Sequence, residues 1–509
     1  MPPTQIEQHT SRRTLINTLL VLALMTSGTA SAEDPELDTK EQKAAPTAFA
    51  AEEPEPVLHW GEGDGKSHLI PALDITGFLV LLNQYDRHFI DSEVYGSDFS
   101  SFKENLTGKW VTDNDAFNIN QFMHPYAGSM YHGFARSAGL GYWTSLGYSA
   151  AGSLLWELGG ETSPPSINDE FTTGYGGTIL GEPLYRMASL LLESGNGKPG
   201  FWRKLGAAAI SPPTGFNRLA YGDRFDGVFR SNNPAVFTRL QLGVNLNATV
   251  NSNVNRNRNA SEAEIPQSYQ DGEVIADFTI GYGLPGKPGY SYTRPFDYFD
   301  FQFTAASSNA FENILSRGLL YGRRYSVGDN YRGVWGLYGT YDYIAPQVFR
   351  VSTSALGLGS TAQWWLSKNV ALQGTALAGV GYGSAGTIHG SGERDYHNGI
   401  SPQGLLVSRL IFGDRAALDF ELRDYYVTGL ASEENDGSEN IIRGVGTLAV
   451  RVYNLHGITV RYTISRRDAQ YGDLADTRQT VGAVSIGYTY LGQTRFGAVD
   501  WRAKSAGGP

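Results

Sequence analysis

The hydrophobic pattern takes on a period of two in the second half of the chain, from Ala235 onward. In the stretch 240–248, every second residue is apolar, and most of the residues between them are polar. A period of two is that of a β-strand whose two faces meet different environments. The pattern predicts about twelve strands. They are 235–250, 272–284, 296–307, 313–323, 331–343, 349–366, 369–383, 403–412, 416–428, 442–453, 457–466 and 480–492.

Connection lengths distinguish a membrane barrel from a soluble sandwich, which also shows such alternation. Long polar connections fall on one parity of the strand count, at 251–271, 384–402, 429–441 and 467–480. Tight turns fall on the other parity, at 367–368, 413–415 and 454–456. Outer-membrane barrels have short periplasmic turns, longer outer loops and an even strand number. Although 285–295 is long for a periplasmic turn, the pattern predicts an antiparallel transmembrane β-barrel with both termini in the periplasm.

Tyr and Trp residues gather near the ends of the predicted strands. Their rings favour the lipid headgroup layer, because one edge is apolar and the other forms hydrogen bonds. Examples are Tyr298, Trp335, Tyr341, Tyr343, Trp364, Trp365, Tyr425, Tyr426, Tyr488 and Tyr490.

The first half of the chain has a helical period instead. Apolar residues between His68 and Arg87 predict one amphipathic helix, and a second helix is expected from Phe171 to Glu193, after a cap near Ser166. Gly141, Ser145, Ser149 and Ser153 form a small-residue stripe on which another backbone can pack. The fold class is therefore α+β, a Gly-rich helical domain followed by the barrel.

The N-terminal residues predict export. Arg12-Arg13, an apolar run from Leu15 to Met25 and small residues up to Ala32 form a signal peptide cleaved after Ala32. The remaining boundaries are a disordered tether at 33–57, the helical domain at 58–230, the barrel at 231–495 and a polar tail at 496–509. A net charge of −11, no cysteine and no basic patch suit the bacterial envelope and exclude nucleic-acid binding. The predicted location is the outer membrane.

Charged residues on tightly packed helices must be paired or exposed. We expect carboxylate–guanidinium pairs that fix helix register, within a polar network. Its members are Asn118, Asn120, His124, Arg136, Glu157, Glu161, Asp169, Glu182 and Arg186. A catalytic hypothesis takes His124 as base, oriented by Glu157 or Asp169, with Ser129 or Ser166 as nucleophile.

Several of these residues lie in distinctive sequence motifs. Residues from about Leu69 to Asp223 resemble bacterial domain-of-unknown-function family 3943. The matching pieces are 117–131, Ala135-Arg136, Trp156-Glu157, 165–169, Gly181-Glu182, Arg186 and 215–218. The resemblance implies no reaction and no catalytic residues.

Other motifs give little evidence for a metal, cofactor or catalytic site. His124 and His132 have no carboxylate at metal-ligand spacing, so we expect no metal site, and we expect no cofactor. The segment His397 to Ser401 invites comparison with barrel enzymes that act on lipids, but its spacing differs from their His-x-Ser arrangement, and we predict an ordinary polar loop.

The primary hypothesis is a noncatalytic outer-membrane barrel with an envelope structural or transport role, whose helical domain plugs or abuts the periplasmic mouth. The expected partners are outer-membrane lipid, the barrel-assembly machinery and a small-molecule or lipid ligand. The alternative is a lipid-directed hydrolase or transferase with its site in the helical domain, and a third hypothesis is a periplasmic binding module tethered by the barrel.

Overall fold

The computed structural model describes residues 57–58, 66–194, 199–222, 229–255, 272–346, 349–386, 388, 392–429, 437–472 and 474–502. The predicted signal peptide and nearly all of the tether 33–57 lie outside the described residues. A short parallel pair, β1 (Val57–Leu58) and β2 (Lys66–Ser67), precedes the helices.

Helices make up the chain from residue 69 to residue 221, which we call the helical region. They are α2 (Leu69–Phe89), α3 (Phe99–Thr107), η1 (Ile119–Met123), α4 (His124–Ser137), α5 (Tyr142–Gly159), α6 (Ile167–Phe171), η2 (Thr172–Gly176), α7 (Gly177–Glu193), α8 (Phe201–Ile210) and α9 (Pro212–Tyr221). Ser166 is the N-cap of α6, and its hydroxyl accepts the Asp169 backbone N–H, as the capping pattern predicts. None of the described helices is long and apolar enough to cross a membrane.

Small residues let the central helices pack backbone against backbone. Ser145, Ser149 and Ser153 of the predicted stripe are buried, and the Ser149 hydroxyl donates to Gly128 O at 3.0 Å. A Cβ atom on Gly128 would lie 1.8 Å from Thr173 O, so only glycine permits this crossing of α4 over η2 and α7. The helical region is therefore fixed by close contacts rather than by long loops.

Twelve antiparallel strands form a closed ring in which β14 pairs with β3, which confirms the predicted fold class. The strands are β3 (Val236–Asn255), β4 (Gly272–Tyr282), β5 (Phe299–Ala306), β6 (Asn313–Val327), β7 (Tyr331–Ile344), β8 (Arg350–Trp365), β9 (Val370–Gly386), β10 (Tyr396–Phe412), β11 (Ala416–Thr428), β12 (Gly437–Tyr453), β13 (His456–Tyr471) and β14 (Asp476–Leu491). We call the end that carries the connections 328–330, 366–369, 413–415 and 454–455 the short-turn end, and the opposite end the long-loop end.

Several strands extend further toward the long-loop end than the sequence predicts. Strand β10 begins at Tyr396, so the segment that we predicted to be a polar loop from His397 to Ser401 is part of the ladder. His397 is buried and its Nδ1 lies 2.7 Å from the Tyr471 hydroxyl. The prediction of a loop there was wrong because small residues interrupt the alternation.

The outer face of part of the barrel is apolar and exposed. The exposed apolar residues lie on β3, on the half of β8 next to the short-turn end, and on β9 to β14. Among them are Leu242, Val244, Leu356, Leu358, Val380, Leu406, Phe420, Leu422, Leu448, Val450, Ile458, Val460, Ile464, Val484 and Ile486. We call this surface the apolar belt.

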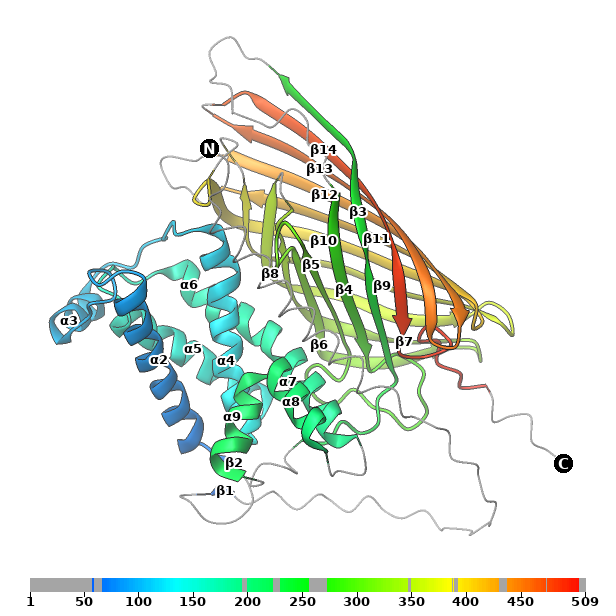
Figure 1. Cartoon of the computed structure of the whole chain (residues 1–509), viewed down its shortest axis with the longest axis horizontal. Coiled ribbons are helices and arrows are strands. Elements are labelled where there is room, and N and C mark those ends of the chain that lie inside the picture. The colour runs from blue at the N-terminus through cyan, green and yellow to red at the C-terminus, as the bar shows by residue number, and fades with distance from the viewer. Residues whose placement is uncertain are drawn as a thin grey trace.

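The helical region covers much of the outer face of β4 to β8 (Figure 1). Ser316 on β6 donates to Ile179 O at 2.8 Å, and Tyr341 on β7 donates to Gln121 O at 2.6 Å. Both side chains point outward, because their neighbours Arg317 and Asp342 face the lumen. The prediction that the helical domain plugs the barrel is therefore wrong: the helices pack against the wall from outside.

Candidate functional site

Three helices bring a histidine and two carboxylates together. His124 begins α4, Glu157 lies near the end of α5, and Asp169 lies in α6. His124 Nε2 is 4.0 Å from Asp169 Oδ1, and its Nδ1 is 3.2 Å from the Thr173 hydroxyl. Glu157 Oε2 accepts the Ser166 backbone N–H at 2.7 Å. We call His124, Glu157 and Asp169 the acid–histidine cluster.

Both π-helical turns lie beside this cluster. η1 ends directly before His124, and η2 contains Thr173. Such turns realign side chains within a helix and occur often at functional sites. Here they place His124 and Thr173 within reach of each other.

Burial perturbs the titration of the cluster. It raises the pKa of Glu157 to about 8, and the nearby charge of Asp169 adds to this effect. It also raises the pKa of Asp169 to about 6, against the charge of His124. Burial alone would lower the pKa of His124, but the charges of Asp169 and Glu157 outweigh it and raise that pKa. Glu157 and Asp169 therefore keep their protons to a higher pH than ordinary carboxyl groups do.

Neither candidate serine donates a hydrogen bond to His124. The Ser166 hydroxyl donates to Asn168 Oδ1 at 2.8 Å while it caps α6, and the Ser129 hydroxyl donates to Tyr126 O at 2.6 Å. Among the described residues, no group of three or more His, Asp or Glu side chains is arranged to hold a metal ion. The acid–histidine cluster thus supplies an acid–base pair, and it activates neither Ser129 nor Ser166.

A second buried cluster joins the helices to the barrel. Glu182 Oε2 accepts Arg136 Nε at 2.7 Å and lies 3.0 Å from His132 Nε2, while Glu182 Oε1 accepts Arg186 Nε at 2.8 Å. Arg186 also donates to Asp297, in the connection before β5, at 3.1 Å. Burial would raise the pKa of Glu182, but the Arg136 guanidinium, the His132 hydrogen bond and the Arg186 guanidinium hold it well below its usual range. We call these five residues the Glu182 cluster.

The other predicted network residues lie at separate places. Asn118 is exposed, whereas Asn120 is buried and donates to Asp113 at 2.6 Å and to the Tyr396 hydroxyl of β10 at 3.0 Å. Glu161 accepts the Trp156 indole N–H at 2.9 Å. The sequence argument therefore groups residues that the structure divides among several sites.

Carboxylate–guanidinium pairing, which we expected throughout the network, is found at Glu182. In the described part of the chain, the carboxylates of Glu157, Glu161 and Asp169 have histidine, backbone, indole, hydroxyl and amide partners instead. Their charges are therefore not neutralised by arginine.

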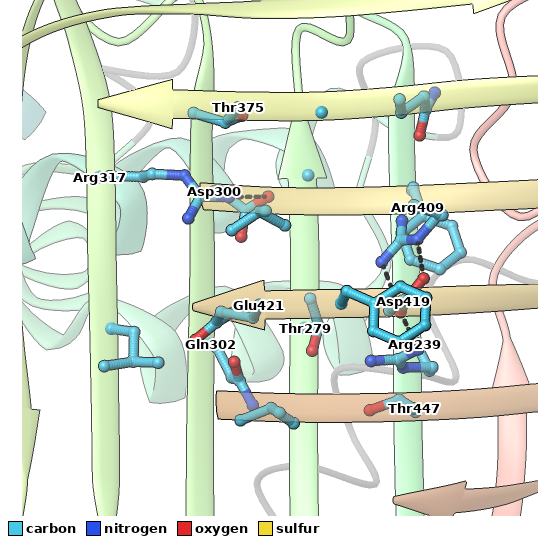
Figure 2. A pocket seen from close by; sticks show the side chains of 18 of the residues that line it. Arg239, Thr279, Asp300, Gln302, Arg317, Thr375, Arg409, Asp419, Glu421 and Thr447 are labelled. Carbon is cyan, nitrogen blue, oxygen red and sulfur yellow. Dashed lines mark hydrogen bonds and ion pairs between the residues drawn. The ribbon is translucent and has the colours of Figure 1, made fainter. Parts of the chain in front are cut away.

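Paired charges also fill the barrel lumen. Asp419 lies between Arg239, at 2.7 Å, and Arg409, at 2.8 Å, and Arg317 pairs with Asp300 at 3.3 Å (Figure 2). These side chains come from strands on opposite walls and border a cavity of about 110 Å³. The lumen at this level holds a few water-sized molecules.

Further pairs cross the lumen nearer the long-loop end. Arg461 of β13 pairs with Asp277 of β4 at 2.8 Å, and Arg423 of β11 pairs with Asp342 of β7 at 2.6 Å. A second cavity, of about 70 Å³, lies beside Arg461. Because the partners belong to strands that are not neighbours in the ring, these pairs connect separate parts of the wall through the lumen.

The chain after β14 turns back into the short-turn end of the lumen. We call residues 492–502 the C-terminal segment. Gln363 donates to Val499 O at 2.7 Å, Gln373 donates to Gly497 O at 2.7 Å, and Trp501 donates to Asp329 O at 2.7 Å. Phe496, Val499 and Trp501 are buried, so this part of the predicted polar tail 496–509 is a packed apolar segment.

Comparison with known families bears on the helical region. Residues 109–213 match a family model described as "Domain of unknown function (DUF3943)". This match confirms the resemblance and contains the acid–histidine cluster. No curated relative matches the chain.

Solved outer-membrane proteins are similar to the barrel at low identity. The NanC porin is 6% identical, with 48% of this chain and 98% of that chain covered and a TM-score of 0.25. The Pseudomonas putida toluene transporter TodX is 10% identical, with 51% and 90% covered and a score of 0.18. The translocator domain of the autotransporter NalP from Neisseria meningitidis is 14% identical, with 52% and 90% covered and a score of 0.19. Scores this low support no conclusion about function.

Sequence reasoning missed two partners that lie in the barrel, after the DUF3943 match. Asp297 and Tyr396 belong to the barrel half and pair with Arg186 and Asn120 of the DUF3943 residues. Their only signal is that polar or aromatic residues occupy positions near strand ends. His132 lies one turn before Arg136 on α4, a spacing that places both on one face and was detectable.

Proposed function

We propose that the protein is an integral outer-membrane barrel that passes small polar solutes only when its C-terminal segment leaves the lumen. The closed ring and the apolar belt support the membrane location. A closed barrel satisfies every strand edge, which the bilayer interior requires. We propose further that the protein is noncatalytic.

The observation that carries the proposal is that the C-terminal segment is bound inside the lumen at the short-turn end. Inward-facing Gln363 and Gln373 bind its backbone, while Phe496 and Trp501 fill the space between the walls. Further along the lumen, the charge pairs border cavities of about 110 and 70 Å³, which limit passage to ions and other small polar solutes. Such a lumen favours gated passage over free diffusion.

Planar bilayer recordings test this proposal. The full chain should be almost silent, whereas a variant ending at Gly492 should give discrete conductance steps because its short-turn mouth is open. A variant ending at Arg502 keeps the seated segment and is the matched control, expected to be silent. Large, steady conductance of the full chain, or silence of the variant ending at Gly492, would overturn the gated barrel.

The acid–histidine cluster favours a second candidate, a hydrolase or transferase acting on lipid. His124 is 14% exposed in its side chain, and two carboxylates with raised pKa lie beside it. An acid–base pair of this kind can activate water without a serine nucleophile. Its position in the region that packs beside the belt suits a lipid substrate.

Separate replacement of His124→Ala and Glu157→Gln discriminates between the two candidates. Fatty-acid release from phospholipid vesicles that is lost in both variants, with melting temperatures no lower than that of the unmodified chain, would favour catalysis. Lower melting temperatures in both variants, without any release by the unmodified chain, would favour a structural cluster.

A further inference from the structure

We propose that a groove on the outer wall of the barrel binds one phospholipid with an anionic headgroup. This inference rests on the proposed membrane location and adds a ligand site to it. We call the site the outer groove.

The outer groove is a cavity of about 440 Å³ over β6, β7 and β8. Its apolar lining includes Leu320, Leu337 and Leu358. Leu337 faces Leu358 across the β7–β8 ladder, in the middle of the wall. Leu358 is 65% exposed and belongs to the apolar belt, so the groove is continuous with the surface that we place in lipid. An acyl chain fits such a trough.

Positive charge gathers where the groove approaches the short-turn end. Arg323 lines the groove and is exposed, and within the described part of the chain its guanidinium has neither a carboxylate nor a hydrogen-bond partner. Arg294 also lines the groove; its Nε lies 3.2 Å from Asp297, a carboxylate that it shares with Arg186. One carboxylate thus faces two guanidiniums. Among the described residues, Arg294 Nη2 is buried without a hydrogen-bond partner.

Aromatic residues mark the depth of the headgroup. Tyr321 and Trp335 line the groove beside Arg323 and are more than half exposed. Trp143 of α5 stacks on Tyr321 with ring centroids 5.3 Å apart, so the helical region forms one rim. Exposed Tyr and Trp residues favour the membrane interface. The apolar trough, the aromatic rim and the guanidiniums follow one another as the tail, glycerol region and anionic headgroup of a phospholipid do.

Guanidiniums recognise phosphate oxygens with charge-assisted hydrogen bonds. The location of the guanidiniums favours a lipid headgroup over free phosphate as the bound anion. They lie at the short-turn end, which the loop pattern assigns to the periplasmic leaflet. A lipid offers both the anion and the chain, whereas free phosphate would leave the trough unfilled. The occupant is therefore the lipid.

Native mass spectrometry of the full chain tests the inference. The protein is reconstituted in nanodiscs of equal parts phosphatidylglycerol and phosphatidylcholine, then released into mild detergent. We expect one retained phosphatidylglycerol per chain, at least about fivefold preferred over phosphatidylcholine. Excess inorganic phosphate should not displace it.

Two variants locate the site, and a third is their control. Arg323→Gln should lose the preference for phosphatidylglycerol, and Leu358→Trp should reduce retention of both lipids by filling the trough. Arg415→Gln, at an exposed arginine of the same barrel end, should behave like the unmodified chain. Equal phosphatidylglycerol retention by Arg323→Gln and the unmodified chain would overturn the proposal, as would displacement by phosphate.

Folding is measured in the same samples by the heat-dependent gel shift of intact barrels. Failure of the unmodified chain to insert and shift would refute the membrane location itself. A normal shift without selective retention would refute only the lipid site.

Discussion

Gln363 and Val499 exchange two hydrogen bonds: the side-chain amide donates to Val499 O at 2.7 Å, and Val499 N–H donates to Gln363 Oε1 at 2.9 Å. An inward-facing side chain thus binds the C-terminal backbone as a neighbouring strand would. The indole N–H of Trp365 adds a third bond to Val499 O at 3.1 Å. The barrel wall therefore recognises the backbone of the segment that closes it.

Breaking these bonds should release the C-terminal segment. The chain has no cysteine, so Val499→Cys provides a unique thiol at a buried site. We expect a maleimide to label this thiol at least about tenfold faster when Gln363 and Gln373 are both alanine, because two or three bonds worth about 1 kcal/mol each are lost.

Gln403 is the control position for these substitutions, because its side chain also faces the lumen but binds Thr340 and Thr353 instead of the C-terminal segment. Gln403→Ala should leave the labelling rate unchanged. Equal rates in all backgrounds would show that the segment is not held by the glutamines.

The loss of stability caused by a charged residue in the apolar belt should depend on the depth of that residue in the bilayer. Ile486→Arg, at an exposed mid-belt position of β14, should lower the free energy of unfolding by about 2–4 kcal/mol, because a guanidinium is costly at the bilayer midplane. Val452→Arg, next to a short turn, should cost about 1 kcal/mol or less. Urea unfolding from lipid vesicles, followed by tryptophan fluorescence, measures both, and equal small costs would argue against a lipid-facing belt.

Stability of the helical region should fall as pH rises from about 4.5 to about 8. The folded state keeps a proton on Glu157, whose pKa is about 8, whereas the unfolded state releases it near the ordinary value. Asp169, with a pKa of about 6, and His124 act in the same direction. Thermal melting followed by circular dichroism at several pH values should show this slope.

Glu157→Gln should remove much of the slope and raise the melting temperature at high pH, since an amide stays neutral. Glu104→Gln, at an exposed position of α3, is the control and should keep the slope of the unmodified chain. A Glu157→Gln curve that matches the unmodified chain would show that Glu157 is ionised in the folded state.

Glu182→Gln should destabilise the helical region by about 3–5 kcal/mol, because it leaves buried cations without their carboxylate. The double variant with Arg136→Met should recover part of this loss, since one cation fewer is then unpaired. Melting temperatures of the three proteins give the comparison, and a single variant as stable as the unmodified chain would contradict the ionised cluster.

The barrel was predictable because alternation and turn length are local signals. Strand β11 has the predicted bounds, 416–428, since Leu418, Phe420 and Leu422 alternate with charges that form lumen pairs. The ring closure between β3 and β14 follows from strand number and parity alone.

The position of the helices was not predicted, although the sequence contains a signal for it. Some outward positions on the covered wall are small or polar, among them Ser316, Gly339, Ser352 and Ser354, where lipid would favour aliphatic residues. The sites were harder to predict from the sequence. Pairs such as His132 with Glu182 depend on which helices cross, and hydrophobic periodicity does not determine which helices cross.

Fractionation of cells that express the full chain tests the central claim most directly. A closed barrel with an apolar belt should sediment with the outer membrane, resist alkaline carbonate and need detergent for extraction. Recovery of the folded chain from the periplasm without detergent would contradict the account.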